Sequence, residues 1–272
     1  MTGPAATPVV VLGAGHRCGS TLIQRLLSSH PDVMIWGEQE GQLDPLLKLG
    51  AHLRECADGL GRRARDKFAE GGYQTFMANL LPGTDDVDDA VRAFVRRLFA
   101  EPALARGRRV WGFKEVRYAR PEVLELHRLF PELAVVFVVR DPRDILRSVD
   151  HWQQLGGWDL REFAEDAIGH WHRVAASFLG PEPAEQADPL SVLTFRYEDL
   201  VRDTAGAADR IAAHTGLDRK LFDMEVFDRQ VPGGPPRDGR VPRPWAELPD
   251  STRALLDTDE SRRIAAAWGY DI

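Results

Sequence analysis

The chain has 272 residues, of which 43% are hydrophobic and 28% charged, and its formal net charge is −7. This length and composition suit one large α/β domain and argue against disorder. The negative balance argues against a general nucleic-acid binder, because phosphate backbones require a basic surface. The two cysteines, Cys18 and Cys56, offer neither a disulfide framework nor metal-ligand spacing, which suits a reducing compartment.

Residues 1–7 do not have the character of a secretory leader, and the sequence holds no apolar run of the roughly 20 residues that cross a bilayer. We therefore expect a cytoplasmic protein with no membrane span and no nucleic-acid partner. Nothing in the sequence indicates its oligomeric state.

Five short apolar segments have the β-branched, nearly continuous character of parallel strands covered on both faces. They are Val9–Leu12, Val33–Trp36, Val110–Lys114, Ala134–Val139 and Ser191–Phe195. Amphipathic patterns predict helices at Thr21–Ser29, Leu43–Ala57, Val87–Ala100, Pro121–Leu129, Arg143–Gln154, Leu160–Leu179 and Gly206–Thr215. This alternation predicts an α/β fold with a doubly wound parallel sheet, whose ligand lies at the carboxyl ends of the strands.

We expect one domain over residues 1–272, with two segments that depart from the alternating pattern. Residues 59–106 begin with a stretch rich in glycine and charge and predict a helical insertion or lid. Residues 228–250 contain the proline- and glycine-rich run 231–245, which predicts a mobile C-terminal loop.

The segment after the first strand has the layout of an anion-binding loop. Gly13, Gly15 and Gly19 precede a predicted helix, so backbone N–H groups and the positive end of the helix dipole converge. The nucleotide triphosphatase pattern G-x-x-x-x-G-K-[ST] does not fit, since Ala14 replaces its first glycine and Ser20 its lysine. The loop predicts a phosphate site for something other than Mg-ATP hydrolysis.

A second polar pair follows the fourth predicted strand. Arg140 stands at the end of that strand, and Ser148 lies two turns into the next helix. A guanidinium and a hydroxyl predict a second phosphate site, at which Arg140 can bind in bidentate fashion. The structural alternative is a surface salt bridge from Arg140 to Asp141 or Asp144.

Two phosphate sites on one α/β sheet resemble the arrangement in the sulfotransferases that use 3′-phosphoadenosine 5′-phosphosulfate (PAPS). Residues 17–21, Arg-Cys-Gly-Ser-Thr, are similar to that family's loop for the 5′-phosphosulfate, and residues 139–148 to its 3′-phosphate element. Residues 197–200, Tyr-Glu-Asp-Leu, are similar to its element beside the nucleotide. The likeness covers most of residues 9–215 and is greatest to the tyrosylprotein sulfotransferase branch, whose H-P-D-V and G-E-E order residues 30–40 follow.

The resemblance implies PAPS as cofactor and no metal requirement. It implies that Arg17 stabilises the leaving phosphate oxygen, and that Cys18, Gly19, Ser20 and Thr21 hold the 5′-phosphate. Arg140 and Ser148 would hold the 3′-phosphate, with Tyr197 beside the nucleotide.

The same resemblance implies the catalytic groups for in-line transfer of a sulfuryl group to a hydroxyl. Glu38 would be the general base, with Glu40 as the fallback, and Lys114 would stabilise the transferring group. The structural alternatives are an exposed loop carboxylate for Glu38 and a pairing with Glu115 for Lys114.

Two positions depart from the tyrosylprotein branch. His16 stands where that branch has proline, and we expect it to make a structural hydrogen bond rather than to touch the acceptor. Trp152 replaces an arginine that holds the cofactor. We expect Arg240 of the C-terminal loop, or else Arg237 or Arg243, to supply the missing charge.

Other classes fit less well. A nucleotide or small-molecule kinase shares the sheet and the P-loop-like element but would need the loop lysine. A cysteine phosphatase built on Cys18 would need arginine where Gln24 stands. A non-catalytic nucleotide binder leaves Glu38 and Lys114 unexplained. The resemblance therefore favours a bacterial-type O-sulfotransferase, and an alcohol or phenol on a small metabolite, sugar or lipid is as good an acceptor candidate as a protein tyrosine.

Overall fold

The computed structural model describes residues 7–154, 160–179, 189–228 and 244–272. Its centre is a sheet of five parallel strands in the order β2-β3-β1-β4-β5. The strands are β1 (Pro8–Gly13), β2 (Val33–Trp36), β3 (Val110–Glu115), β4 (Ala134–Val139) and β5 (Val192–Arg196). All five predicted strands are present, and no bound differs from the prediction by more than one residue.

Helices connect the strands and follow the last one. They are α1 (Ser20–Ser29), α2 (Asp44–Cys56), α3 (Arg62–Gly71), α4 (Thr84–Val95), α5 (Glu101–Leu104), α6 (Arg120–Leu129), α7 (Pro142–Gln154), α8 (Leu160–Ser177), α9 (Tyr197–Arg202), α10 (Thr204–Thr215), α11 (Asp250–Arg253) and α12 (Asp259–Ala267). Within the described ranges, none of these helices combines the length and the apolar character that a membrane crossing requires.

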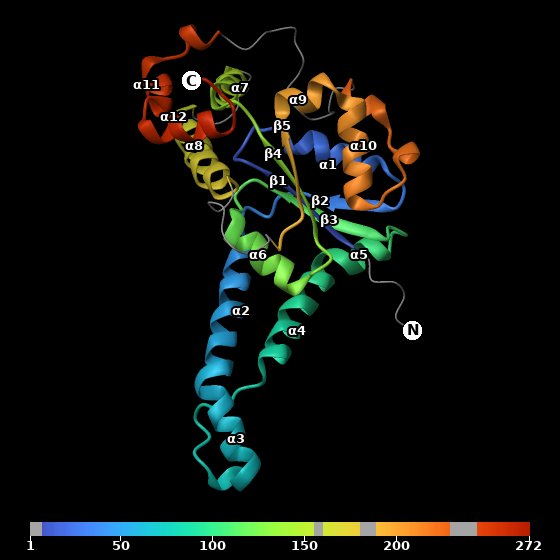
Figure 1. The fold of residues 1–272 in the computed structure, drawn as a ribbon, viewed down its shortest axis with the longest axis vertical. Coiled ribbons are helices and arrows are strands. Elements are labelled where there is room, and N and C mark those ends of the chain that lie inside the picture. Colours follow the sequence, from blue (N-terminus) through green and yellow to red (C-terminus); the bar gives the residue numbers. More distant parts are fainter. Residues whose placement is uncertain (1–6, 155–159, 180–188, 229–243) are drawn as a thin grey trace.

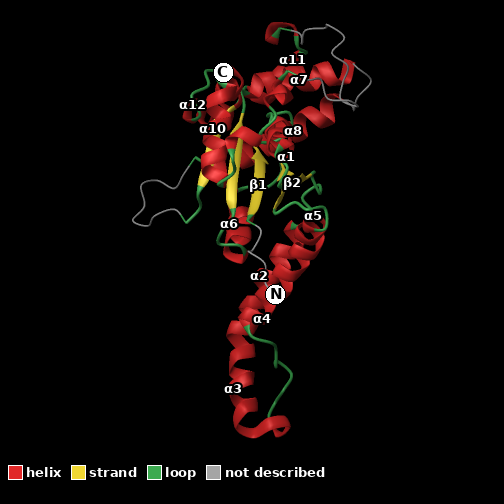
Figure 2. Cartoon of the chain, turned by 90° about the vertical axis from the view of Figure 1, so that its right-hand side faces the viewer, coloured by secondary structure: helices red, strands yellow, loops and turns green. Residues whose placement is uncertain are grey.

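Helices cover both faces of the sheet (Figures 1 and 2). On β1, Val9 and Val11 point into a core shared with α1 and α10, whereas Val10 and Leu12 point into a second core shared with α6, α7 and α8. Successive side chains of a strand face opposite sides, so a strand covered on both sides must be apolar at every position. The predicted doubly wound α/β fold is confirmed.

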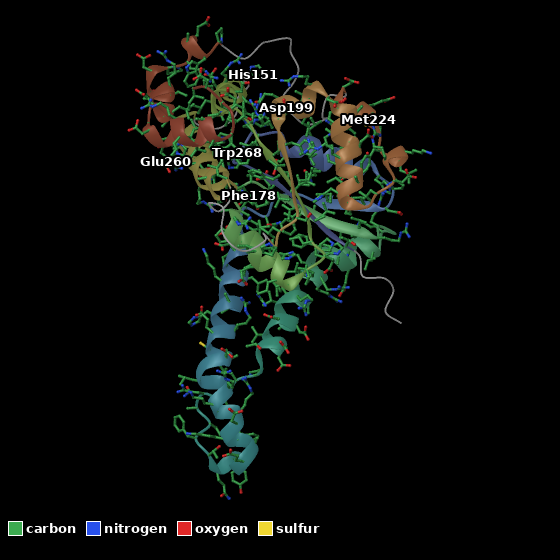
Figure 3. The ribbon with its side chains drawn as sticks, viewed as in Figure 1. His151, Phe178, Asp199, Met224, Glu260 and Trp268 are labelled. Atoms are coloured by element: carbon green, nitrogen blue, oxygen red, sulfur yellow. The ribbon has the colours of Figure 1, made fainter. Side chains whose placement is uncertain are left out.

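Aromatic rings close the second core on β4. Phe137 stacks on Phe178 with ring centroids 4.4 Å apart and lies 5.7 Å from Trp268; both partners are labelled in Figure 3. The Trp268 indole N–H donates to the carbonyl of Ala175 at 3.1 Å. The C-terminal segment is thereby fastened to α8.

The predicted insertion, residues 59–106, falls on α3, α4 and α5, and its role as a lid stays a prediction. Together with α2, the helices α3 and α4 form a hairpin that extends away from the sheet, with α3 at its far tip (Figure 1). Helix α2 packs on α4 and α6. Apolar side chains of α2 and α4, among them Leu53 and Phe94, line a cavity of about 400 Å³ between the two helices.

The predicted C-terminal loop falls mainly on residues 229–243, which lie outside the described residues together with Arg237, Arg240 and Arg243. The remainder of the predicted segment is partly helical. A short 3₁₀ turn spans Trp245–Glu247 and leads into α11.

Gly112 marks the tightest approach between two central strands. A Cβ at this position of β3 would lie 1.7 Å from the carbonyl oxygen of Val9 on β1. We expect Gly112→Ala to lower the free energy of unfolding by about 2 kcal/mol or more, since the backbones must move apart. Urea denaturation followed by circular dichroism measures this loss.

Gly169 is the matched control. It is an exposed position in α8, and a Cβ there meets nothing within 4 Å. Gly169→Ala should stabilise the protein by roughly 0.5–1 kcal/mol through helix propensity. Equal effects of the two substitutions would contradict the steric explanation.

Candidate active site

The order of the strands in the sheet determines where the site lies. β1 lies between β3 and β4, and the chain leaves the sheet toward opposite sides after β1 and β4. Ligands of open α/β sheets bind at such a switch point, outside the carboxyl ends of the strands. The segments 14–19, 37–40, 116–119 and 140–141 follow these ends. They carry the predicted site residues Arg17, Cys18, Gly19, Glu38 and Arg140.

The loop after β1 depends on glycine at position 19. Gly19 has φ 100° and is the N-cap of α1, and a Cβ there would lie 2.3 Å from Cδ2 of Tyr197. Gly19 has no side chain to cap the helix, and beyond the N–H of Ser20, which bonds to Cys18, the N–H groups of the first turn are available to an anion. Ser20 is buried in this first turn and Thr21 is exposed. The predicted loop residues and Tyr197 are thus brought together.

Cys18 faces the protein interior rather than the ligand side. Its side chain is fully buried, and its Sγ fills the space beside Gly13. Burial raises the pKa of the Cys18 thiol, which outweighs the hydrogen bonds from Ser20. A catalytic cysteine requires a lowered pKa, so this environment does not support the phosphatase alternative. The main chain of Cys18 remains part of the loop.

Arg17 and Arg140 join the loops that follow β1 and β4. The Nε of Arg17 donates to Oγ of Ser148 at 3.0 Å, and a terminal nitrogen of Arg140 donates to the main-chain oxygen of Arg17 at 2.9 Å. Aromatic rings lie beneath both guanidinium groups: Trp152 is 5.0 Å from Arg17, and Tyr197 is 4.3 Å from Arg140. Ser148 was predicted beside Arg140, but in the structure it binds Arg17.

The salt-bridge alternative for Arg140 is wrong within the described residues. Asp141 pairs with Arg143 at 2.8 Å, and Asp144 pairs with Arg147 at 2.7 Å. Among the described side chains no carboxylate forms an ion pair with Arg140 or with Arg17, and the buried Nε of Arg140 has no hydrogen-bond partner. Within the described residues, no carboxylate therefore competes with a bound anion for either cation.

The charges around Arg17 also favour a bound anion at this position. Burial and the nearby charge of Arg140 lower the pKa of Arg17. Two partly buried like charges oppose each other. An anion placed between them would relieve this repulsion and would be bound through charge-assisted hydrogen bonds.

Glu38 and Lys114 lie together, at the ends of the neighbouring strands β2 and β3. The nearly buried ammonium of Lys114 donates to Oε1 of Glu38, and Arg117 donates to Oε2 of Glu38 at 3.0 Å. The predicted alternative pairing of Lys114 with Glu115 is not observed, because Glu115 pairs with Arg117 at 3.1 Å. Glu38 is an exposed loop residue, as the structural alternative expects, but its side chain is only 27% exposed and pairs with both cations.

The environment of Glu38 keeps it ionised. Burial by itself would raise the pKa of Glu38, but the charge and hydrogen bond of Lys114, with His16 and Arg117, bring it below its ordinary value. Glu115 is fully buried and accepts from the main-chain N–H of Gly41 at 2.9 Å and of Val116 at 2.8 Å. The segments after β2 and β3 are thereby tied together.

Sequence reasoning missed three supporting residues, Arg117, Glu198 and Tyr270. Arg117 could have been suspected, since it follows the same strand end as Lys114. Glu198 accepts from the main-chain N–H of Asp141 at 3.1 Å and from the hydroxyl of Tyr270 at 2.9 Å. That carboxylate holds the turn after Arg140, and no local pattern indicates its pairing with a residue near the C-terminus.

A family model and two curated relatives are similar to this chain. The model of the sulfotransferase family matches residues 8–221. Protein-tyrosine sulfotransferase 1 of Danio rerio is 25% identical over 200 residues, 71% of this chain and 49% of the relative. The Homo sapiens protein of the same name is 24% identical over 172 residues, 61% and 40% of the two chains. The chain thus spans about half the length of the curated relatives it matches.

Two solved structures are similar at low identity. The sulfotransferase domain of the Synechococcus PCC 7002 olefin synthase has a TM-score of 0.49 and 18% identity, covering 97% of this chain and 95% of that one. A sulfotransferase from Alicyclobacillus acidocaldarius has a TM-score of 0.48 and 16% identity, covering 100% and 98%. The family match does not favour the kinase alternative. It extends from the first strand past the Tyr-Glu-Asp-Leu element, and the chain belongs to the sulfotransferase family.

Proposed function

We propose that the protein is a PAPS-dependent O-sulfotransferase, a cytoplasmic, bacterial-type enzyme with a single catalytic domain. Its acceptor would be a hydroxyl of a small metabolite, sugar or lipid, or a phenol. The name of the curated relatives, protein-tyrosine sulfotransferase, supports a phenolic hydroxyl. The chain spans about half of those relatives, so the proposal does not commit to a protein acceptor.

One observation carries the proposal. Arg17 and Arg140 lie at the ends of adjacent strands with no described carboxylate paired to either, next to the Glu38–Lys114 pair. A nucleotide with phosphate groups at both its 3′ and 5′ positions would satisfy both guanidinium groups at once.

The residues present fit such a nucleotide. The buried, unpartnered Nε of Arg140 and the uncapped start of α1 offer donors for phosphate oxygens. Gly19, Ser20 and Thr21 would hold the 5′-phosphate, with the main chain of Cys18. Arg140 would hold the 3′-phosphate beside Tyr197. Ser148 would bind an oxygen of that phosphate or keep its hydrogen bond with Arg17. Arg240, outside the described residues, is proposed as a further contact.

PAPS, when bound, supplies an activated sulfuryl group. Lys114 and Arg17 would neutralise charge that develops on the oxygens around the sulfur and on the leaving phosphate. Glu38 would remove the proton of the acceptor hydroxyl. Because these side chains supply the positive charge, the proposed transfer requires no metal.

Glu38→Gln tests the proposed base. We expect transfer of radiolabelled sulfate from PAPS to a responsive acceptor to fall about 100- to 10,000-fold, because the amide cannot take a proton. The affinity for 3′,5′-ADP, measured by calorimetry, should change less than about threefold, since the proposed role of Glu38 is to act on the acceptor and not to hold the nucleotide.

Glu40→Gln is the matched control. Glu40 is exposed and two residues from Glu38, and no ion pair of its carboxylate is found among the described residues. It should keep transfer within a few-fold of the wild type. If Glu40→Gln loses transfer and Glu38→Gln keeps it, the base is wrongly assigned.

Arg140→Ala tests the proposed 3′-phosphate site. Loss of charge-assisted hydrogen bonds worth about 1.5–3 kcal/mol should weaken 3′,5′-ADP binding about 10- to 100-fold. The affinity for 5′-AMP, which lacks the 3′-phosphate, should be nearly unchanged. Equal weakening of both nucleotides would show that Arg140 does not distinguish the 3′-phosphate.

A further inference from the structure

The arm formed by α2, α3 and α4, residues 44–95, projects away from the sheet (Figures 1 and 2). The chain is helical without a break over residues 44–71, where α2, five residues in π-helical geometry and α3 follow one another. At a rise of 1.5 Å per residue this run is about 40 Å long. The tip of the arm is therefore far from the two cores that cover the sheet.

Exposed apolar side chains are concentrated on this arm. Among the described residues twelve large apolar side chains are exposed, and eight of them belong to residues 44–95. Tyr73 and Phe76, which follow α3, are 81% and 72% exposed, and Phe94 of α4 is 51% exposed. The eight are Leu49, Leu53, Leu60, Phe68, Tyr73, Phe76, Met77 and Phe94. Exposed apolar surface gathered in one place marks an interaction site.

The arm carries a groove and, separately, aromatic side chains that can enter one. The cavity of about 400 Å³ between α2 and α4 is lined by Leu49, Leu53 and Phe94 among others. All three are exposed, so the cavity opens to solvent. Phe68 follows Leu49 by 19 residues on the same helical run, which places it roughly 28 Å nearer the tip. The tip of an arm therefore cannot fill its own groove, whereas the tip of a second, antiparallel arm can.

Two close approaches show how α4 lies beside the helical run. A Cβ on Gly61 would lie 3.4 Å from Cβ of Leu81, and a Cβ on Gly50 would lie 2.9 Å from Cγ2 of Val91. Asp85 belongs to the first turn of α4 and lies between these two levels, nearer to that of Gly61. The start of α4 is therefore beside the middle of the arm.

Exposed charges of opposite sign flank this middle. Arg63 and Lys67 lie on the tip side of Leu60, and Asp85 lies on its sheet side. Within the part of the chain that the structure describes, none of these three charges belongs to an ion pair. When two arms lie antiparallel about a twofold axis at Leu60, Arg63 of each copy meets Asp85 of the other. The same complementary pair then occurs twice, as an isologous interface requires.

We propose that the arm is a dimerisation element, which pairs antiparallel with the arm of a second copy of this chain. The aromatic side chains at each tip enter the groove of the partner, and Leu60 packs on its counterpart at the axis. A face about 40 Å long and two helices wide, roughly 20 Å, offers about 800 Å² per copy, the area that each partner of a stable complex buries. This inference does not depend on the proposed function.

The charge of the arm favours a second copy over a lipid surface. Residues 44–95 carry nine acidic and seven basic side chains. Helices that lie on anionic membranes are rich in lysine and arginine on their polar face. The acidic excess opposes such binding, whereas the pairing of Arg63 with Asp85 requires only a second arm.

The mass of the full-length protein in solution is the first test. Sedimentation equilibrium should give twice the mass of one chain. Phe76→Ser should weaken the dimer at least 10-fold, because it removes an aromatic ring from the partner's groove. Leu221→Ser is the matched control, since Leu221 is 46% exposed but lies outside the arm, and it should change the dimer affinity less than threefold.

Charge reversal tests the pairing itself. Arg63→Glu alone and Asp85→Arg alone should each weaken the dimer at least 10-fold, because like charges then face each other twice. An equimolar mixture of these two variants should dimerise within threefold of the wild type. In the mixed dimer one pair is native and the other has its charges exchanged, so both attract.

Two controls show that the variants are folded: their circular dichroism and their 3′,5′-ADP affinity should match those of the wild type. A wild type that stays monomeric at about 100 µM would overturn the proposal, and its sedimentation with phosphatidylserine vesicles would assign the arm to a membrane instead. A dimer that withstands Phe76→Ser and both charge reversals, or a mixture that does not recover, would equally overturn it. A dimer that binds no 3′,5′-ADP would count against the proposed function alone.

Discussion

The proximity of two guanidinium groups is the constraint on which the site depends. Arg17 and Arg140 are tied together through the main-chain oxygen of Arg17, although their like charges oppose this arrangement. The rings of Trp152 and Tyr197 support them through cation–π attraction. The parallel pairing of β1 and β4 brings the two loops to the same edge of the sheet, so the fold itself holds the charges in place.

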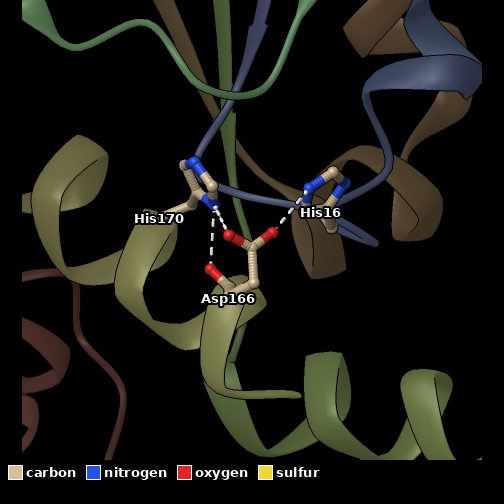
Figure 4. Close-up of side chains that lie close together, drawn as sticks. All are labelled: His16, Asp166 and His170. Carbon is tan, nitrogen blue, oxygen red and sulfur yellow. Dashed lines mark hydrogen bonds and ion pairs between the residues drawn. The ribbon is translucent and has the colours of Figure 1, made fainter. Parts of the chain in front are cut away.

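Helix α8, which lies outside the sheet, also holds the two arginine loops in place. A Cβ on Gly15 would lie 2.9 Å from the carbonyl oxygen of Ala167, so the loop after β1 is in close contact with the helix backbone. The indole of Trp171 donates to the carbonyl of Arg140 at 3.1 Å, and Asp166 faces His16 (Figure 4). One helix therefore positions both arginine loops and the imidazole. A rigid support of this kind reduces the reorganisation needed when charge develops during a reaction.

The strands and the loop chemistry could be read from the sequence because each depends on local pattern. Continuous apolar runs ended by glycine or charge define β1 and β4, and the glycine before α1 defines the anion loop. The catalytic roles of Glu38 and Lys114 were implied only by family resemblance, and the pairing of the two side chains was not predicted. Its geometric cause is that β2 and β3 are neighbours in the sheet.

Other features depend on contacts between distant segments. Amphipathic patterns predicted α2 and α4, but they do not specify the direction in which a helix leaves the sheet, so the extended hairpin could not be predicted from them. The spacing of Asp166 and His170 is common on solvated helices. Their relation to His16 follows from the packing of α8 on the loop, which no sequence pattern records.

The central claim is that Arg17 and Arg140 form one site for a nucleotide with 3′ and 5′ phosphate groups. Calorimetric titration of the purified protein with 3′,5′-ADP and with ATP, each with and without Mg²⁺, tests it most directly. The account predicts tight binding of 3′,5′-ADP, one per chain and indifferent to Mg²⁺, and much weaker binding of ATP. Binding of Mg-ATP alone would contradict it and favour a kinase.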